Sequence, residues 1–167
     1  MPERLSERLR VYLGSDHAGY RLKSAVLQRL TELGLETVDV GPRAWRDGDD
    51  YPPQVMETAR RTVADHGSLG VVIGGSGNCA AMAANKIPGC RAALAWSEET
   101  ARLGRAHDDA NVVSIGARMH PVPDAVRFVE TFLRTPFGHG ERQVRRIAML
   151  TAFEIPFEIP FAKEAVS

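Results

Sequence analysis

The feature that most constrains this chain is a glycine-rich turn between a short apolar run and an alanine-rich segment. Residues 71–73 have the composition of a buried strand, and the turn follows at residues 74–78. An alanine-rich helix is predicted from Asn78 onward. A turn between a strand and a helix start leaves backbone N–H groups free to point at an anion. The hydroxyl of Ser76 and the thiol of Cys79 make this segment a candidate reaction site.

Short apolar runs and amphipathic segments alternate along the rest of the chain. Strands are predicted at residues 10–13, 36–40, 69–73, 91–96 and 112–115, and helices at residues 20–33, 53–64, 78 onward, 97–107, 123–133 and 140–153. This alternation predicts an α/β fold, with one five-stranded, mostly parallel sheet and helices on both of its faces. Residues 1–152 are expected to form a single domain. Residues 153–167 repeat FEIP, whose prolines oppose a helix, and are expected to form an extended or disordered tail.

Composition narrows the classes of protein that this chain can belong to. The 167 residues suit one domain, and the formal charge of zero gives no field that attracts nucleic acid or an acidic membrane. Neither a signal-like leader nor an apolar run of about 18 residues is present, so a soluble, untargeted protein is expected. The two cysteines do not make a disulfide framework, which favours the cytoplasm. His120 and His139 lack metal-ligand spacing, and neither metal nor cofactor is expected.

Polar residues follow several predicted strands, where parallel sheets bind their ligands. They are Asp16 and His17 after the first strand, Ser76 after the third and Arg118 after the fifth. His107 ends the helix before the fifth strand, and Arg142 and Arg146 lie one turn apart on the last helix, where two guanidinium groups can grip one phosphate. We expect all of these groups at one edge of the sheet, which favours a site.

Plainer interpretations of each signal remain open. Asp16 and His17 can cap a helix, His107 can complement a helix dipole, and the two arginines can form a solvated face. The glycine turn also resembles a dinucleotide-binding fingerprint, although such a fingerprint follows the first strand of a sheet rather than the third.

Several blocks of sequence, taken in order, carry a more specific signal. They are SDHAGYRLK (15–23), DDYP (49–52), GGSGN (74–78), AANKIPG (83–89), RAALAW (91–96), HDDAN (107–111), IGARM (115–119) and RQVRR (142–146). Together they resemble type B ribose-5-phosphate isomerase and the related galactose-6-phosphate isomerase subunits, over residues 10–150. The resemblance implies a single Rossmann-like domain, a homodimer or dimer of dimers, and a metal-free aldose–ketose isomerisation of ribose 5-phosphate or a close relative.

The resemblance also implies roles for individual residues. A base moves a proton between C1 and C2 of the opened sugar through a cis-enediolate, and His107 assists ring opening. The charge of the enediolate is stabilised by Ser76, Gly75, Gly77 and Asn78. The phosphate is held by His17, Arg118, Arg142 and Arg146. The sugar hydroxyls or the reacting end are bound by Asp16 and Tyr51. In this family the C-terminal arginines come from the neighbouring subunit, so the site is composite.

The chain departs from the family at the proton-transfer centre. One branch carries its base as a cysteine at the position of Gly74, and the other as a glutamate at the position of Ala80. Cys79 is one residue away from the latter, a rotation of about 100° on a helix, so it is not a simple substitute. A thiol near a helix start can nevertheless act as a base. Asp108 replaces the usual asparagine beside the histidine and is a second candidate.

Three hypotheses follow from the sequence. The first is an active sugar-phosphate isomerase whose base is Cys79 or Asp108. The second is a non-catalytic sugar-phosphate-binding protein, or a subunit of a hetero-oligomer. The third is a nucleotide-binding module, which rests on the glycine turn alone.

Overall fold

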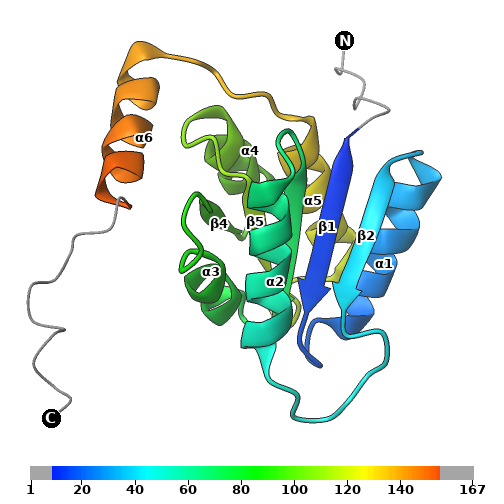
Figure 1. Ribbon diagram of the computed structural model, residues 1–167. Helices are drawn as coiled ribbons and strands as arrows, with labels where there is room; N and C mark the ends of the chain where they lie inside the picture. Colours follow the sequence, from blue (N-terminus) through cyan, green and yellow to red (C-terminus); the bar gives the residue numbers. More distant parts are fainter. Residues whose placement is uncertain (1–8, 155–167) are drawn as a thin grey trace, which may run out of the picture.

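The computed structural model describes residues 9–154, which form one parallel sheet flanked by helices (Figure 1). The five strands lie in the order β2-β1-β3-β5-β4. They are β1 (Arg10–Ser15), β2 (Glu36–Gly41), β3 (Leu69–Gly74), β4 (Ala92–Ala95) and β5 (Val112–Gly116). The helices are α1 (Tyr20–Glu32), α2 (Tyr51–Ala64), α3 (Asn78–Ala84), α4 (Glu98–Ala106), α5 (Val122–Arg134) and α6 (Glu141–Phe153). The predicted α/β fold is confirmed, and every strand pair is parallel.

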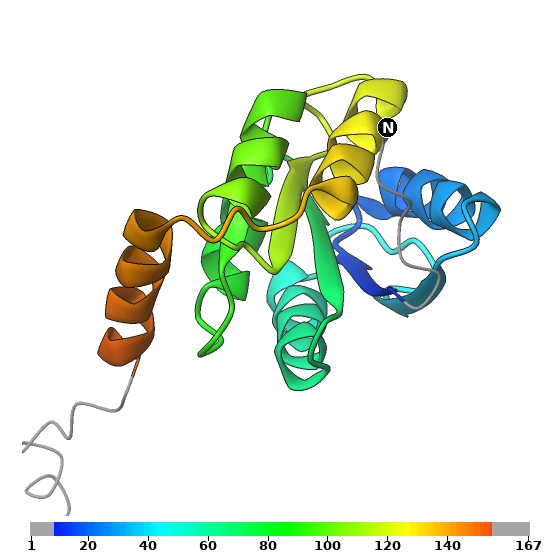
Figure 2. The same ribbon diagram turned by 90° about the horizontal axis from the view of Figure 1, so that it is seen from above.

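Helices cover both faces of the sheet, as Figure 2 shows from above. Helices α1, α4 and α5 contribute to the larger of two buried apolar clusters, and α2 and α3 contribute to the smaller one. Side chains of successive strand residues point to opposite faces. In β3, Val71 and Ile73 therefore belong to the larger cluster, whereas Val72 belongs to the smaller one.

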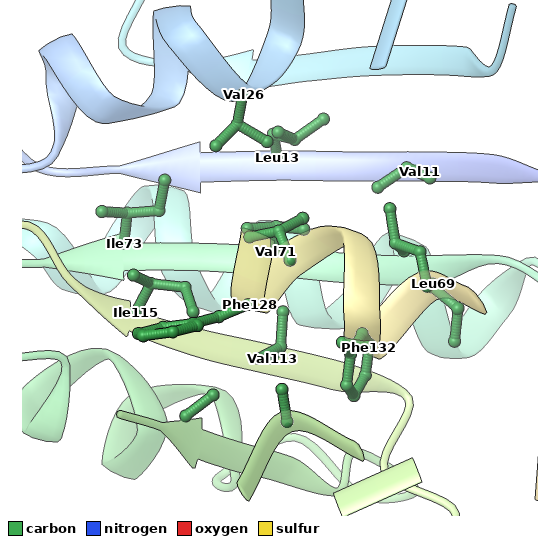
Figure 3. Close-up of a cluster of buried hydrophobic side chains, with 14 of the residues drawn as sticks. Val11, Leu13, Val26, Leu69, Val71, Ile73, Val113, Ile115, Phe128 and Phe132 are labelled. Atoms are coloured by element: carbon green, nitrogen blue, oxygen red, sulfur yellow. The ribbon is translucent and has the colours of Figure 1, made fainter. Parts of the chain in front are cut away.

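The larger cluster holds the sheet to its helices through side chains that are almost all aliphatic. Figure 3 shows β1, β3 and β5 presenting valine, leucine and isoleucine to α1 and α5. Phe128 and Phe132 of α5 close this layer, and Phe132 is fully buried. Burial of each such side chain contributes about 2 kcal/mol, so the sheet is a firm support for the loops at its edges.

Helix α6 differs from the others because none of its residues is buried. It stands apart from the sheet and its helices in both ribbon views (Figures 1 and 2). The carboxylate of Glu154, just after α6, accepts a 2.8 Å hydrogen bond from the backbone N–H of Gly89. The sequence correctly predicts this helix but does not show that it lacks a partner in its own domain.

Predicted and observed element bounds agree to within two residues. The predicted tail begins at Phe153, which is the last residue of α6, and residues 155–167 lie outside the described part of the chain. Across residues 9–154, no helix combines the length and the apolar character needed to cross a membrane.

Candidate active site

The strand order places a topological switch point between β1 and β3, at the carboxyl edge of the sheet. The chain runs from β1 outward to β2 on one side, and β3 lies on the other side of β1. Ligands of open parallel sheets bind at such a switch point, beyond the carboxyl ends of the strands. The loops that follow β1 and β3 meet here, at the lower end of the sheet in Figure 1, and β5 is the next neighbour of β3.

The glycine turn after β3 is fastened to the end of β5. Gly74 and Gly75 accept backbone hydrogen bonds of 2.9 and 3.0 Å from Ala117 and Arg118. Gly77 has a φ of +82°, and a Cβ added there would lie 3.0 Å from the backbone nitrogen of Gly116, so only glycine fits without strain. The turn is therefore rigid, and it leads directly into α3, whose first N–H groups have no partner within the helix.

Side chains from three loops gather around this turn. A Cβ added to Gly75 would lie 3.6 Å from Nη1 of Arg118 and 3.8 Å from the Cβ of Ala18. The guanidinium group after β5 thus lies against the turn after β3 and close to the loop after β1. The Ser76 hydroxyl accepts a 3.3 Å hydrogen bond from the backbone N–H of Asn78. A cationic group, a hydroxyl and backbone donors are consequently brought together at one place.

The loop after β1 is ordered by two carboxylates. Asp16 accepts a 2.9 Å hydrogen bond from the backbone N–H of Gly19, the residue before α1, so it orders the turn into this helix but does not cap the helix itself. Asp49, from the loop before α2, accepts a 2.6 Å hydrogen bond from the backbone N–H of His17 and lies 3.2 Å from Nδ1 of its ring. The sequence reasoning did not single out Asp49, although the DDYP block contains it.

Positions 74 and 80, where the sequence resemblance places the base of the two family branches, both lie beside Cys79. A Cβ added to Gly74 would lie 3.3 Å from the sulfur of Cys79 and 3.6 Å from the Cβ of Ala80. Tyr51, at the start of α2, packs against the same buried cluster as Ala80. Adjacent residues of a helix do point about 100° apart, which separates Cys79 from position 80. The end of β3 nevertheless runs beside the start of α3 and brings position 74 next to Cys79. The thiol therefore lies next to the space that a side chain at position 74 would enter.

The other predicted residues lie elsewhere in the chain. His107, Asp108, Arg142 and Arg146 line a single cavity of about 770 Å³ between α6 and the domain. His107 ends α4 and comes before β5, so it lies at the amino edge of the sheet, whereas Arg118 follows β5. With five residues in β5 at about 3.3 Å each, these two edges are roughly 15 Å apart. The expectation that all the polar groups share one edge is therefore wrong within one chain.

A further cavity of about 640 Å³ at the amino edge contains none of the predicted site residues. Its arginines are already engaged, because Arg91 and Arg105 bind the carboxylate of Asp109, at 2.9 and 2.8 Å, and Arg134 lies 3.7 Å from the carboxylate of Glu130. We therefore assign this cavity no part in the chemistry.

Comparison with known proteins identifies the class of protein that this fold and site define. A family described as Ribose/Galactose Isomerase matches residues 11–150, and the chain belongs to that family. The family prediction made from the sequence blocks is confirmed.

Relatives within the family are similar over nearly their whole length. Ribose-5-phosphate isomerase B of Mycobacterium tuberculosis is 49% identical over 152 residues, which cover 91% of this chain and 94% of that protein. The probable ribose-5-phosphate isomerase B of Mycoplasma pneumoniae is 38% identical over 144 residues, which cover 86% of this chain and 94% of the relative. The crystal structure of ribose-5-phosphate isomerase B from Mycoplasma genitalium with bound ribulose-5-phosphate matches with a TM-score of 0.84 at 35% identity, over 87% of this chain and 96% of that one.

Proposed function

We propose that this chain is an aldose–ketose isomerase that interconverts ribose 5-phosphate and ribulose 5-phosphate, or a closely related pair of sugar phosphates. The observation that carries the proposal is the Arg118 guanidinium group beside the Gly75 turn and the loop that holds His17. This arrangement places a cationic group that can bind an anion next to backbone hydrogen-bond donors. The relatives named ribose-5-phosphate isomerase B, one of them with bound ribulose-5-phosphate, support the same activity.

The proposed reaction moves a proton between C1 and C2 of the opened sugar. Negative charge develops on oxygen as the proton leaves carbon, and the rigid turn aims the Ser76 hydroxyl and the N–H groups of residues 75–79 at that charge. Each such donor contributes about 3 kcal/mol to catalysis in comparable sites. His17 and Arg118 hold the phosphate at the far end, so that binding energy orients the reacting carbons. Asp16 and Tyr51 bind the sugar hydroxyls.

Cys79 is our preferred base, because of the position of its sulfur. The thiol lies 3.3 Å from where a Cβ at Gly74 would be, which is the position from which one branch of the family presents its cysteine. Asp108 is the second candidate. It lies at the amino edge in this chain, so it reaches the turn only from a neighbouring subunit.

The assembly that we propose is a homodimer, or a dimer of dimers, with composite sites. His107, Arg142 and Arg146 share a cavity on one side of the chain, and the glycine turn lies at the opposite edge. Two copies related by a two-fold axis can bring both groups together at each of two sites. Helix α6 supports this assembly because it exposes Met149, Leu150 and Phe153, the last of them 90% exposed. We place the enzyme in the cytoplasm, where its two free thiols stay reduced.

The activity is tested with a panel of ribose, allose, erythrulose and galactose phosphates. We expect aldose–ketose conversion of at least one member, and the substrates to differ by roughly 1–3 kcal/mol for each group that a pocket distinguishes. Exchange of solvent deuterium into C2 of the sugar reports the proton transfer directly. Failure of every sugar phosphate to exchange would overturn the proposed function.

The base is tested with Cys79→Ala and Asp108→Asn, measured separately. Loss of deuterium exchange in one variant, with sugar-phosphate binding kept, identifies the base. Cys90→Ala is the control for the loss of a thiol, because Cys90 is the only other cysteine of the chain and its side chain is buried. Full turnover in both test variants would show that neither residue is the base.

A sugar-phosphate-binding protein without catalysis is the second candidate function. It is favoured by Gly74 and Ala80, which place no proton-transferring group at either family position. Calorimetry would then show binding of a sugar phosphate while no member of the panel exchanges deuterium.

A further inference from the structure

Asp49 is the residue through which the loop before α2 contacts the loop after β1. We propose that Asp49 is a positioning residue, which holds the His17 imidazole in the orientation and protonation that an anionic ligand requires. The inference deepens the proposed function, because it assumes that His17 binds the phosphate of the substrate. It adds a residue that has no direct contact with that phosphate.

One oxygen of Asp49 controls both the backbone and the ring of His17. Oδ1 accepts the backbone N–H at 2.6 Å and lies 3.2 Å from Nδ1. The Asp49 side chain is only 14% exposed, and that of His17 is 26% exposed. The two residues are 32 positions apart in sequence, so the contact depends on the tertiary fold. A carboxylate that engages both atoms leaves the ring little freedom to rotate.

This contact also decides which ring nitrogen faces a ligand. When Nδ1 donates its proton to Asp49, Nε2 is the nitrogen that remains for the ligand. A phosphate oxygen accepts hydrogen bonds, so Nε2 must carry a proton as well. The proposed role therefore requires an imidazole with one N–H for Asp49 and one for the phosphate. Carboxylates orient metal-bound histidines in the same way, through the nitrogen that the ligand does not use.

The second oxygen of Asp49 indicates that the carboxylate is more than a loop anchor. Oδ2 is buried and has no hydrogen-bond partner within residues 9–154. A buried acceptor without a donor is costly, and a role in binding or catalysis is one of the few explanations for keeping it. If this residue only anchored the loop, an asparagine would serve at least as well, because its amide has no charge to bury.

The test uses Asp49→Asn in the full chain, because asparagine keeps the acceptor oxygen and removes the charge. We expect the dissociation constant of inorganic phosphate to rise about tenfold, as is typical for the loss of one charge-assisted interaction. The KM for the sugar phosphate should rise by a similar factor, with kcat changed less than about twofold. Asp47→Asn is the matched control, because this aspartate lies in the same loop and is exposed. Equal phosphate affinity in the two variants would overturn the inference.

A double-mutant cycle distinguishes positioning from direct binding or a general loss of structure. In the His17→Asn background, Asp49→Asn should leave phosphate affinity unchanged, because its effect passes through the imidazole. An effect of the same size with and without His17 would refute the positioning role.

Nitrogen-15 spectra of the imidazole rings provide a readout that needs no substitution at Asp49. The His17 signals, assigned by their loss in His17→Asn, should show Nδ1 protonated in the free protein and both nitrogens protonated with inorganic phosphate bound. An unprotonated Nδ1 in the free protein would overturn the inference. If these signals and the coupling are found but no sugar phosphate is turned over, the positioning role stands and the proposed isomerase function fails.

Discussion

At the scale of single residues, the two cysteines occupy contrasting environments. Burial raises the pKa of the Cys90 thiol to about 12, and this residue is 4% exposed. Cys79 is partly exposed beside the glycine turn. Thiolates are the reactive form of cysteine, and they form where the group is accessible. The chemistry available to the two thiols is therefore different, although both are free.

Alkylation should separate the two thiols. Iodoacetamide at about pH 8 is expected to modify Cys79 and to leave Cys90 intact, because the buried thiol stays protonated. Peptide mass spectrometry measures the site, and a saturating sugar phosphate should slow the modification if the thiol lies in the binding site. Faster labelling of Cys90 would contradict the environments described above.

Lys23 is a charged residue whose side chain is almost completely buried. Its side chain is 1% exposed, and its ammonium group binds the carboxylate of Asp39 and donates a 2.7 Å hydrogen bond to the carbonyl of Pro42. This contact ties α1 to the end of β2 and to the start of the loop that contains Asp49.

Replacing this ammonium group should destabilise the fold. Lys23→Met leaves the Asp39 carboxylate unpaired, and we expect the free energy of unfolding to fall by about 3 kcal/mol, the lower end for a broken buried pair because Asp39 is partly exposed. Urea unfolding measures the change. Arg21→Met on the exposed side of the same helix is the control, with an expected change within about 0.5 kcal/mol. A similar loss in both variants would show that the buried contact has no special role.

At the scale of elements, α4 has the most clearly encoded beginning. Ser97 accepts a 3.1 Å hydrogen bond from the backbone N–H of Thr100, and the Thr100 hydroxyl accepts one of the same length from the backbone N–H of Ser97. Ser97→Ala should lower the free energy of unfolding by about 1 kcal/mol, whereas Ser97→Asp should keep most of it. Thermal unfolding measures both variants, and equal melting temperatures for serine and alanine would contradict the capping role.

Helix α2 should respond to acid through Glu57. Hydrogen bonds from Arg60 and Arg61 lower the pKa of its carboxyl from 4.5 to about 2. Because this pKa is lower in the folded state, its stabilisation is present above about pH 4.5 and is lost as the pH falls towards 2. Glu57→Gln should cost less than about 1 kcal/mol at neutral pH, since the pairs are near the surface. Melting curves from pH 7 to 2 should show the difference between the two proteins disappearing as acid is added.

Most elements could be predicted because their signals are local. The apolar runs of β1, β3 and β5, and the cap before α4, are visible within a few residues of sequence. The contact between Asp49 and His17 joins residues 32 positions apart and leaves no local pattern. The position of the Cys79 sulfur depends on the end of β3 lying beside the start of α3, which a single-helix argument omits. Long-range packing therefore limited the prediction of the site more than that of the fold.

At the scale of the whole molecule, the predicted site residues form two groups. One group surrounds the glycine turn, and the other, which contains His107 and Arg146, lines the cavity beside α6. Sequence order already places His107 before β5 and therefore at the amino edge, but it could not show that α6 brings Arg142 and Arg146 to that same edge.

Mixing two inactive variants should restore activity if the sites are composite. One variant, Cys79→Ala, is defective at the glycine turn. The other, Arg142→Ala with Arg146→Ala, is defective in the cavity beside α6. The two variants are mixed in equal amounts, dissociated and allowed to reassociate. Half of the dimers then contain one chain of each kind and have one intact site of two, so about a quarter of the normal turnover should return. Turnover of sugar phosphate measures the recovery. No recovery, with mixed dimers demonstrated by mass, would contradict the composite site.

The exposed position of α6 has a consequence for cells that carry more than one version of this gene. In the dimer proposed above, a chain with defective arginines on α6 disables one of the two sites that it shares with an intact chain, while the intact α6 completes the other. A cell with one intact and one defective version would then keep about half of its turnover, and turnover per chain would fall on dilution as partners separate.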